Sequence, residues 1–152
     1  MVITTAESRA RIAEDLATAA ERLAAAAAAL GDAYERLDQA TADRLEDELY
    51  APIQRASGRA RRAHGEFCGR FGLEPRELAT PPASAGGHPP KALIDTAVGA
   101  VGDATHVLAA LQDSGHPVEA GDEELRSVLV EIRRLVEGVP GRARELERSL
   151  GR

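Results

Sequence analysis

The feature that most constrains this chain is a leucine that recurs at every seventh position of its first forty residues. The four leucines are Leu16, Leu23, Leu30 and Leu37, and alanines fill most of the alternate apolar positions between them. A seven-residue apolar repeat places one narrow stripe along an α-helix, as in a coiled coil or a long helix of a bundle. The sequence therefore predicts a long first helix with a seam that faces another helix.

The two ends of this helix follow from other residues. Thr4 and Glu7 have the spacing of a capping box, which satisfies free N–H groups at a helix start. Gly31 is a weak point for a helix at this position, and a helix stop with a new N-cap at Asp32 is the alternative there. Because the leucine repeat continues through Gly31 to Leu37, one helix that runs to about Leu49 is favoured, and Pro52 is expected to end or kink it.

Three further helices are expected after Pro52. The second covers roughly residues 53–71, and a flexible linker rich in proline and glycine follows at 73–90. The third helix begins at Pro89-Pro90, and the fourth begins near Asp122 and extends almost to the end of the chain. The predicted fold class is all-α, an antiparallel bundle of about four helices with a long first helix, in a single domain that covers residues 1–152.

Composition narrows the kinds of function. The net charge of -6 disfavours a general nucleic-acid binder, which usually carries a basic surplus. One cysteine, Cys68, allows no internal disulfide and fits a reducing compartment. The N-terminal region becomes charged at once, and the longest apolar run of the sequence, Leu23 to Leu30, is too short for a membrane span. We therefore expect a cytoplasmic protein with no membrane partner and no cofactor.

Metal binding has one candidate pair, His64 and Cys68, which lie one turn apart on the second helix. An imidazole and a thiolate together suit zinc or copper. A second pair is needed to complete four ligands, and none is evident. Di-iron bundles use Glu-x-x-His pairs, and no histidine of this chain follows a glutamate at that spacing. A half-buried histidine beside a small core cysteine is the favoured interpretation.

The same helix carries Arg59 and His64 with four residues between them. This spacing resembles the Arg-x4-His motif of HEPN ribonucleases, which are also small all-α bundles. The resemblance covers six residues and implies RNA cleavage by Arg59 and His64 brought together across a dimer, with both as the catalytic candidates. The alternative interpretation is a solvated basic helix face.

A basic face on the second helix comprises Arg55, Arg59 and Arg62, with Arg61 and Arg70 nearby. The preceding stretch, residues 32–48, is acidic. If the chain reverses near Pro52, the two stretches lie antiparallel and their charges pair, which is the favoured role of the arginines. Contact between Arg55–Arg70 and a phosphate backbone, as in a small subunit of a nucleoprotein complex, is the second alternative.

The leading functional hypothesis is a non-enzymatic interaction or assembly protein. It acts through the seam of Leu16, Leu23, Leu30 and Leu37, which packs on the protein itself, on a second copy or on a protein partner. An HEPN-like ribonuclease or a metal-binding bundle centred on Arg59, His64 and Cys68 is the competing class. No catalytic, cofactor or metal site is assigned from the sequence.

Overall fold

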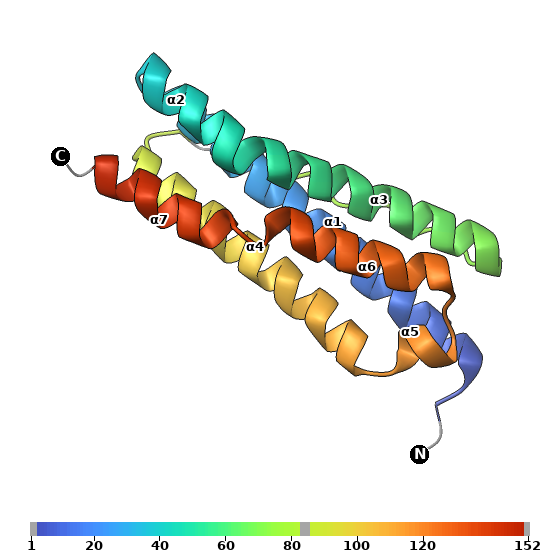
Figure 1. Cartoon of the computed structure of the whole chain (residues 1–152). Helices are drawn as coiled ribbons and strands as arrows, with labels where there is room; N and C mark the ends of the chain where they lie inside the picture. Colours follow the sequence, from blue (N-terminus) through green and yellow to red (C-terminus); the bar gives the residue numbers. More distant parts are fainter. Residues whose placement is uncertain (1–2, 83–85, 151–152) are drawn as a thin grey trace.

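Four helical rods make up the fold, as the sequence predicts. The computed structural model describes residues 3–82 and 86–150, and every regular element in these residues is a helix. The rods are α1 (Thr5–Tyr34); α2 (Gln39–Leu45) with the π-helical turn η1 (Glu46–Tyr50) and α3 (Ala51–Phe71); α4 (Pro90–Asp113); and α6 (Glu123–Val136) with α7 (Val139–Leu150). The four-residue helix α5 (His116–Glu119) joins α4 to α6. Figure 1 shows the rods side by side.

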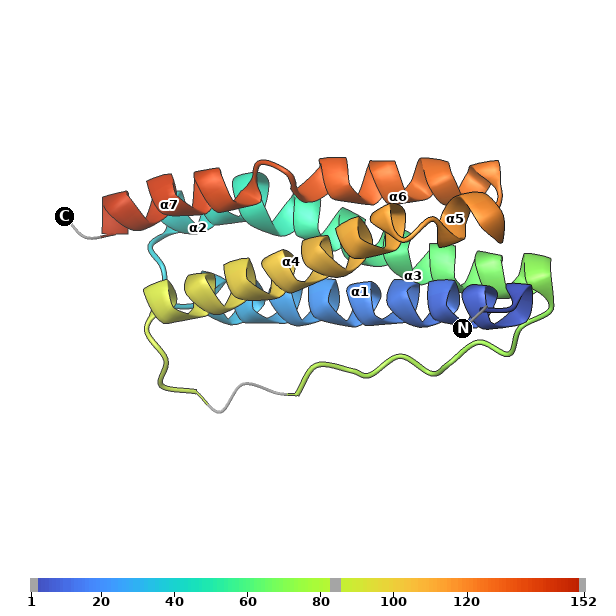
Figure 2. The ribbon, with the colours of Figure 1, turned by 90° about the horizontal axis from the view of Figure 1, so that it is seen from below.

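The rods are arranged so that neighbours run in opposite directions. α1 runs against both α3 and α4, and α6 with α7 runs against them as well, while α3 and α4 share one direction (Figure 2). A chain that leaves α3 must therefore return along the whole bundle before α4 can begin. Residues 73–82 lie along α1 on this return path (Figure 2), and an extended segment with the length of 73–89 reaches about 55 Å, more than the roughly 45 Å of α1.

The predicted linker at 73–90 is thus a crossover that follows the bundle. Its first part is held by Arg76, which binds Glu14 and Glu21 of α1, and its last part by Arg36, whose guanidinium donates to the carbonyl of His88 over 2.7 Å. Residues 83–85 of the predicted linker lie outside the described residues. The mobility of this segment stays a prediction.

The first helix starts as predicted but ends earlier. Thr4 and Glu7 form the capping box, and the helix passes through Gly31 without a break. It ends at Tyr34, so the prediction of one helix to about Leu49 is wrong. The reversal lies at residues 35–38, where the Asp38 carboxylate accepts from the Thr41 amide over 2.8 Å and caps α2. Leu37 keeps the seven-residue spacing although it stands in this turn, which is why the repeat did not reveal it.

Pro52 neither ends nor starts a rod. The N–H of Ala51 reaches back five residues to the carbonyl of Glu46, which makes a π-helical turn, and the helix continues into α3. Proline has no N–H, so the Glu48 carbonyl four residues earlier lacks its helical donor. The Nε atom of Arg142 in α7 donates to this carbonyl over 2.8 Å. A contact from a distant helix therefore completes the backbone bonding around Pro52.

The later boundaries follow the predicted signals. Gly72 closes α3 with a φ of 68°, Pro89 precedes α4, and the Asp122 side chain caps α6 by accepting from the Leu125 amide over 2.9 Å. The predicted fourth helix is interrupted once, by a turn at Glu137 and Gly138, because Pro140 has no N–H to donate to the carbonyl four residues earlier.

The core lies between α1 and the two rods that flank it. α1 packs along α4 over most of its length and along α3 nearly as extensively, whereas α4 and α6 make few contacts with each other. The core side chains are mainly Leu, Ile, Val and Ala, with Phe67 the one fully buried ring among the described residues. No described helix is long and apolar enough to cross a membrane.

Candidate functional site

The predicted leucine seam lies in the protein's own core. Leu16, Leu23 and Leu30 are 0%, 0% and 1% exposed, and Leu37 packs against the same core from the turn after α1. The partners of the seam are α3 and α4 of the same chain. Of the three packing arrangements foreseen for the seam, the structure shows packing on the protein itself, so a further partner needs another surface.

The candidate metal pair is buried as well. His64 and Cys68 are 4% and 0% exposed on the inner side of α3. Burial lowers the pKa of His64, with the charge of Arg76 acting in the same direction, and burial raises the pKa of the Cys68 thiol. Both groups are therefore favoured in their neutral forms. The described residues contain no group of three or more side chains suited to a metal ion.

The candidate catalytic residues Arg59 and His64 face different neighbours. The Nε atom of Arg59 lies 3.0 Å from a carboxylate oxygen of Glu131 in α6. The charges that act on His64 belong to Arg76, Glu14 and Glu21, on the side of α1 and the crossover. Five residues along an α-helix turn through about 500°, so the two side chains point apart within one molecule.

The basic face is divided between ion pairs and solvent. Arg70 lies 2.6 Å from Asp122 and 2.8 Å from Glu124, while Arg55 and Arg62 are exposed. The predicted pairing of these arginines with residues 32–48 is wrong. Residues 39–48 form one rod with α3 and cannot fold back on it, and in the described residues no ion pair joins these arginines to the acidic residues at 32–38. The carboxylates that pair with Arg59 and Arg70 come from α6.

A cluster that the sequence did not reveal holds the crossover on α1. Arg76 lies 3.0 Å from Glu14 and 2.9 Å from Glu21, and Glu21 also accepts from the Ala79 amide over 2.6 Å. The hydrogen bond from Arg76 is the largest cause that lowers the pKa of Glu21. This cluster is a structural clasp, since all of its polar groups bind one another.

A groove of 570 Å³ lies between α4 and α6. The α4 wall comes from residues at helical spacing with small or short side chains, and the α6 wall ends at the start of α7. Its lining residues are Val101, Gly102, Thr105, His106, Ala109, Gln112, Val130, Arg133, Arg134, Val136, Glu137 and Pro140. Because α4 turns its large residues toward α1, the side toward α6 does not fill the space between the helices.

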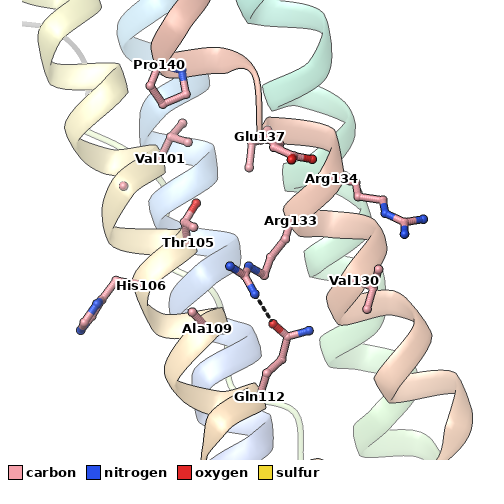
Figure 3. A pocket seen from close by; sticks show the side chains of 12 residues that line it. Val101, Thr105, His106, Ala109, Gln112, Val130, Arg133, Arg134, Glu137 and Pro140 are labelled. Carbon is pink, nitrogen blue, oxygen red and sulfur yellow. Dashed lines mark hydrogen bonds between the residues drawn. The ribbon is translucent and has the colours of Figure 1, made fainter.

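Two arginines and one glutamate set the charge of this groove. Figure 3 shows Arg133 reaching across to α4, where it donates to the Gln112 side chain over 2.6 Å, and Arg134 extending outward on the far side of α6. Within the described residues neither arginine has a carboxylate partner, while Glu137 is the acidic residue of the lining. Guanidinium has five N–H donors, so Arg133 keeps donors for a further acceptor.

Val130 gives the groove an apolar edge. Val130 is 40% exposed and is one of few exposed large apolar residues in the described part of the chain. It also borders a second hollow on the outer face of α6, which Arg126 and Leu135 line as well. The sequence signal for the groove was the spacing Gly102, Thr105, Ala109 and Gln112, a second stripe on the third helix beside its leucine stripe. That stripe carries small residues, and hydrophobic periodicity alone assigns it no partner.

Comparison with protein-family models, with curated proteins and with solved structures gives no match. The groove between α4 and α6 is therefore interpreted from its geometry and chemistry.

Proposed function

We propose that this protein is a non-enzymatic interaction protein that binds an amphipathic helix of a partner in the groove between α4 and α6. The observation that carries the proposal is an open groove with an apolar floor and two arginines that form no ion pair with a carboxylate of the described residues. A helix laid in a groove uses apolar residues three and four apart as anchors. In this groove they would meet the accessible side chains of Ala109 and Val130.

Size supports a helix as the occupant. One turn of an α-helix rises about 5.4 Å and has a diameter of about 10 Å with its side chains, which amounts to roughly 400 Å³. The groove of 570 Å³ accepts the apolar side chains along one face of a helix.

Charge supports an acidic partner. The protein as a whole carries a net charge of -6, yet the groove has two arginines against one glutamate. A carboxylate on the flank of a bound helix would pair with Arg133, and Arg134, which extends outward from α6, would add positive charge at the edge of the groove, so that charge would set the orientation and specificity of the bound helix. The same arginines would repel a basic helix.

The lining does not favour catalysis. Thr105 and His106 are adjacent in sequence, and a hydroxyl nucleophile needs a base that it can reach. Figure 3 shows His106 extending away from the groove while Thr105 points into it. The arrangement offers apolar contact and cations, which are the components of a docking surface.

The test uses two synthetic helices of about 18 residues that share one apolar face. One has glutamates on both flanks and the other has lysines at the same positions. We expect calorimetry to show binding of the glutamate-flanked helix and binding at least about tenfold weaker for the lysine-flanked helix. The double variant Arg133→Glu/Arg134→Glu should reverse this preference.

The matched control is Arg61→Glu/Arg62→Glu on the exposed side of α3, which changes the net charge equally and leaves the groove intact. Equal binding of both helices, or the same loss in the control as in the groove variant, contradicts the proposal. Light scattering on the protein alone measures its mass in solution, and a dimer would indicate that another copy of this chain covers the groove.

A further inference from the structure

The two tyrosines of this chain meet in one pocket. The pocket has a volume of 290 Å³ and is lined by Gly31, Tyr34 and Glu35 from the end of α1 and by Glu46 and Tyr50 from η1. The sequence contains two tyrosines and two phenylalanines in total, and the phenylalanines belong to α3. Half of the aromatic residues of the protein therefore line one small hollow at the end of the bundle where α1 turns back into α2.

Local structure explains how these residues converge. Gly31, Tyr34 and Glu35 lie three and four positions apart, so they share one face of α1. Glu46 and Tyr50 are the first and last residues of the π-helical turn η1, which precedes Pro52 and accepts a hydrogen bond from Arg142. Such turns widen a helix locally and redirect its side chains. A Cβ atom added at Gly31 would meet nothing within 4 Å, so the glycine keeps this part of the pocket open.

The carboxylates of this pocket are available to a ligand. Glu35 and Glu46 are exposed, and in the described part of the chain neither makes a side-chain hydrogen bond or an ion pair. Nearby arginines are engaged elsewhere, since Arg36 binds the His88 carbonyl and Arg44 binds Glu48. The pocket therefore combines two aromatic side chains with two uncompensated negative charges.

We propose that this pocket binds an organic cation, a guanidinium or ammonium group on an alkyl chain. Aromatic faces attract such cations through the ring quadrupole, and carboxylates add direct hydrogen bonds and charge. The alkyl part of the cation would contact the tyrosine rings. The site is independent of the groove between α4 and α6, because it is built from α1 and η1.

The composition of the chain supplies a reporter for this site. The protein has no tryptophan, so its intrinsic ultraviolet fluorescence comes from Tyr34 and Tyr50. We expect a saturable change of this emission when propylguanidinium, spermidine or an acetylated and amidated Gly-Arg-Gly tripeptide is added. Propylurea, which has nearly the shape of propylguanidinium and no charge, should give no saturable change. Tighter binding of the tripeptide than of propylguanidinium assigns the cation to a partner's arginine, and the reverse order assigns it to a free small molecule.

Two variants leave the reporter in place. Glu35→Gln/Glu46→Gln should weaken cation binding at least about tenfold, and Gly31→Leu should abolish it by filling the pocket. The control Asp43→Asn/Asp47→Asn removes the same number of charges from α2 and η1, outside the pocket lining, and should bind like the wild type. Circular dichroism verifies that each variant is folded. Absence of a saturable change with all three cations overturns the proposal, as does equal binding of propylurea or unaltered binding by the glutamine variant.

Discussion

The two sides of α4 face other helices in different ways. Toward α1, α4 presents Leu93, Ile94, Leu108 and Leu111, which are nearly or fully buried against the leucine stripe of α1. Toward α6, it presents Gly102, Thr105 and Ala109, which are partly or fully exposed and line an open groove of 570 Å³. The same helix thus forms one closed interface and one open interface within a single bundle.

The difference shows where to look for a docking surface in a helical protein of this composition. The most regular apolar stripe is the one that the chain uses for its own core, since burial of large apolar side chains stabilises the fold most. The weaker stripe, made of small residues, leaves volume between the helices. An interaction partner is expected at this second stripe.

The largest expected effect is on the closed side. Leu23→Ala removes a side chain that is 0% exposed and should lower the free energy of unfolding by about 3 kcal/mol, through lost burial and the cavity that remains. Val130→Ala at the groove, where the side chain is 40% exposed, should change it by less than about 0.5 kcal/mol. Urea denaturation of both variants measures the contrast. Similar losses at the two positions would show that the groove is not open.

Larger side chains should also destabilise the closed interface with α1 more than the open interface with α6. Ala26→Leu places a larger group at a position that is 0% exposed on α1 and should cost about 2 kcal/mol by overpacking. Ala109→Leu adds the same atoms inside the groove and should leave the stability within about 0.5 kcal/mol of the wild type. A large loss for Ala109→Leu would mean that α4 and α6 pack closely in solution.

The clasp of the crossover should contribute less. Arg76→Ala breaks both ion pairs to α1, and because the Arg76 side chain is 37% exposed we expect a loss of about 1 kcal/mol, with Arg55→Ala as the exposed control. Limited proteolysis should then cut within residues 73–82 sooner than in the wild type. Unchanged stability together with unchanged cleavage would assign the crossover's position to other contacts.

We expect a still smaller effect from His64, which should make the free energy of unfolding depend on pH. Its pKa in the folded protein lies below the ordinary value of 6.5, so the unfolded chain takes up a proton at a pH where the folded protein does not. The free energy of unfolding should therefore fall as the pH decreases from about 7 through 6.5 and below. Urea midpoints measured across this range should show a smaller slope in His64→Gln, and an identical slope would contradict the burial of a neutral imidazole.

Much of the fold was predictable because its signals are local. The capping box at Thr4, the start of α4 after Pro89 and the cap at Asp122 each need a few neighbouring residues, and all three are confirmed. The leucine repeat also identified the buried face of α1 correctly. It failed at the reversal after Tyr34, because Leu37 packs on the core from a turn as well as it would from a helix.

The parts that escaped prediction depend on residues far apart in sequence. Pro52 continues a helix because Arg142, 90 positions later, lies beside the Glu48 carbonyl. The ion pairs of Arg59 and Arg70 with α6 required knowing which rods are neighbours. The groove itself arises where side chains are too small to fill a space, and a pattern of small residues does not say whether another helix covers them.

The most direct test of this account maps where a partner helix binds. In a ¹H–¹⁵N NMR titration with the glutamate-flanked helix, we expect the amide signals of Val101, Thr105, Val130 and Arg133 to shift, while those of Leu16, Leu23 and Leu30 stay in place. Shifts concentrated on the three leucines of α1 would mean that the bundle opens to expose its seam, and the groove between α4 and α6 would then not be the docking surface.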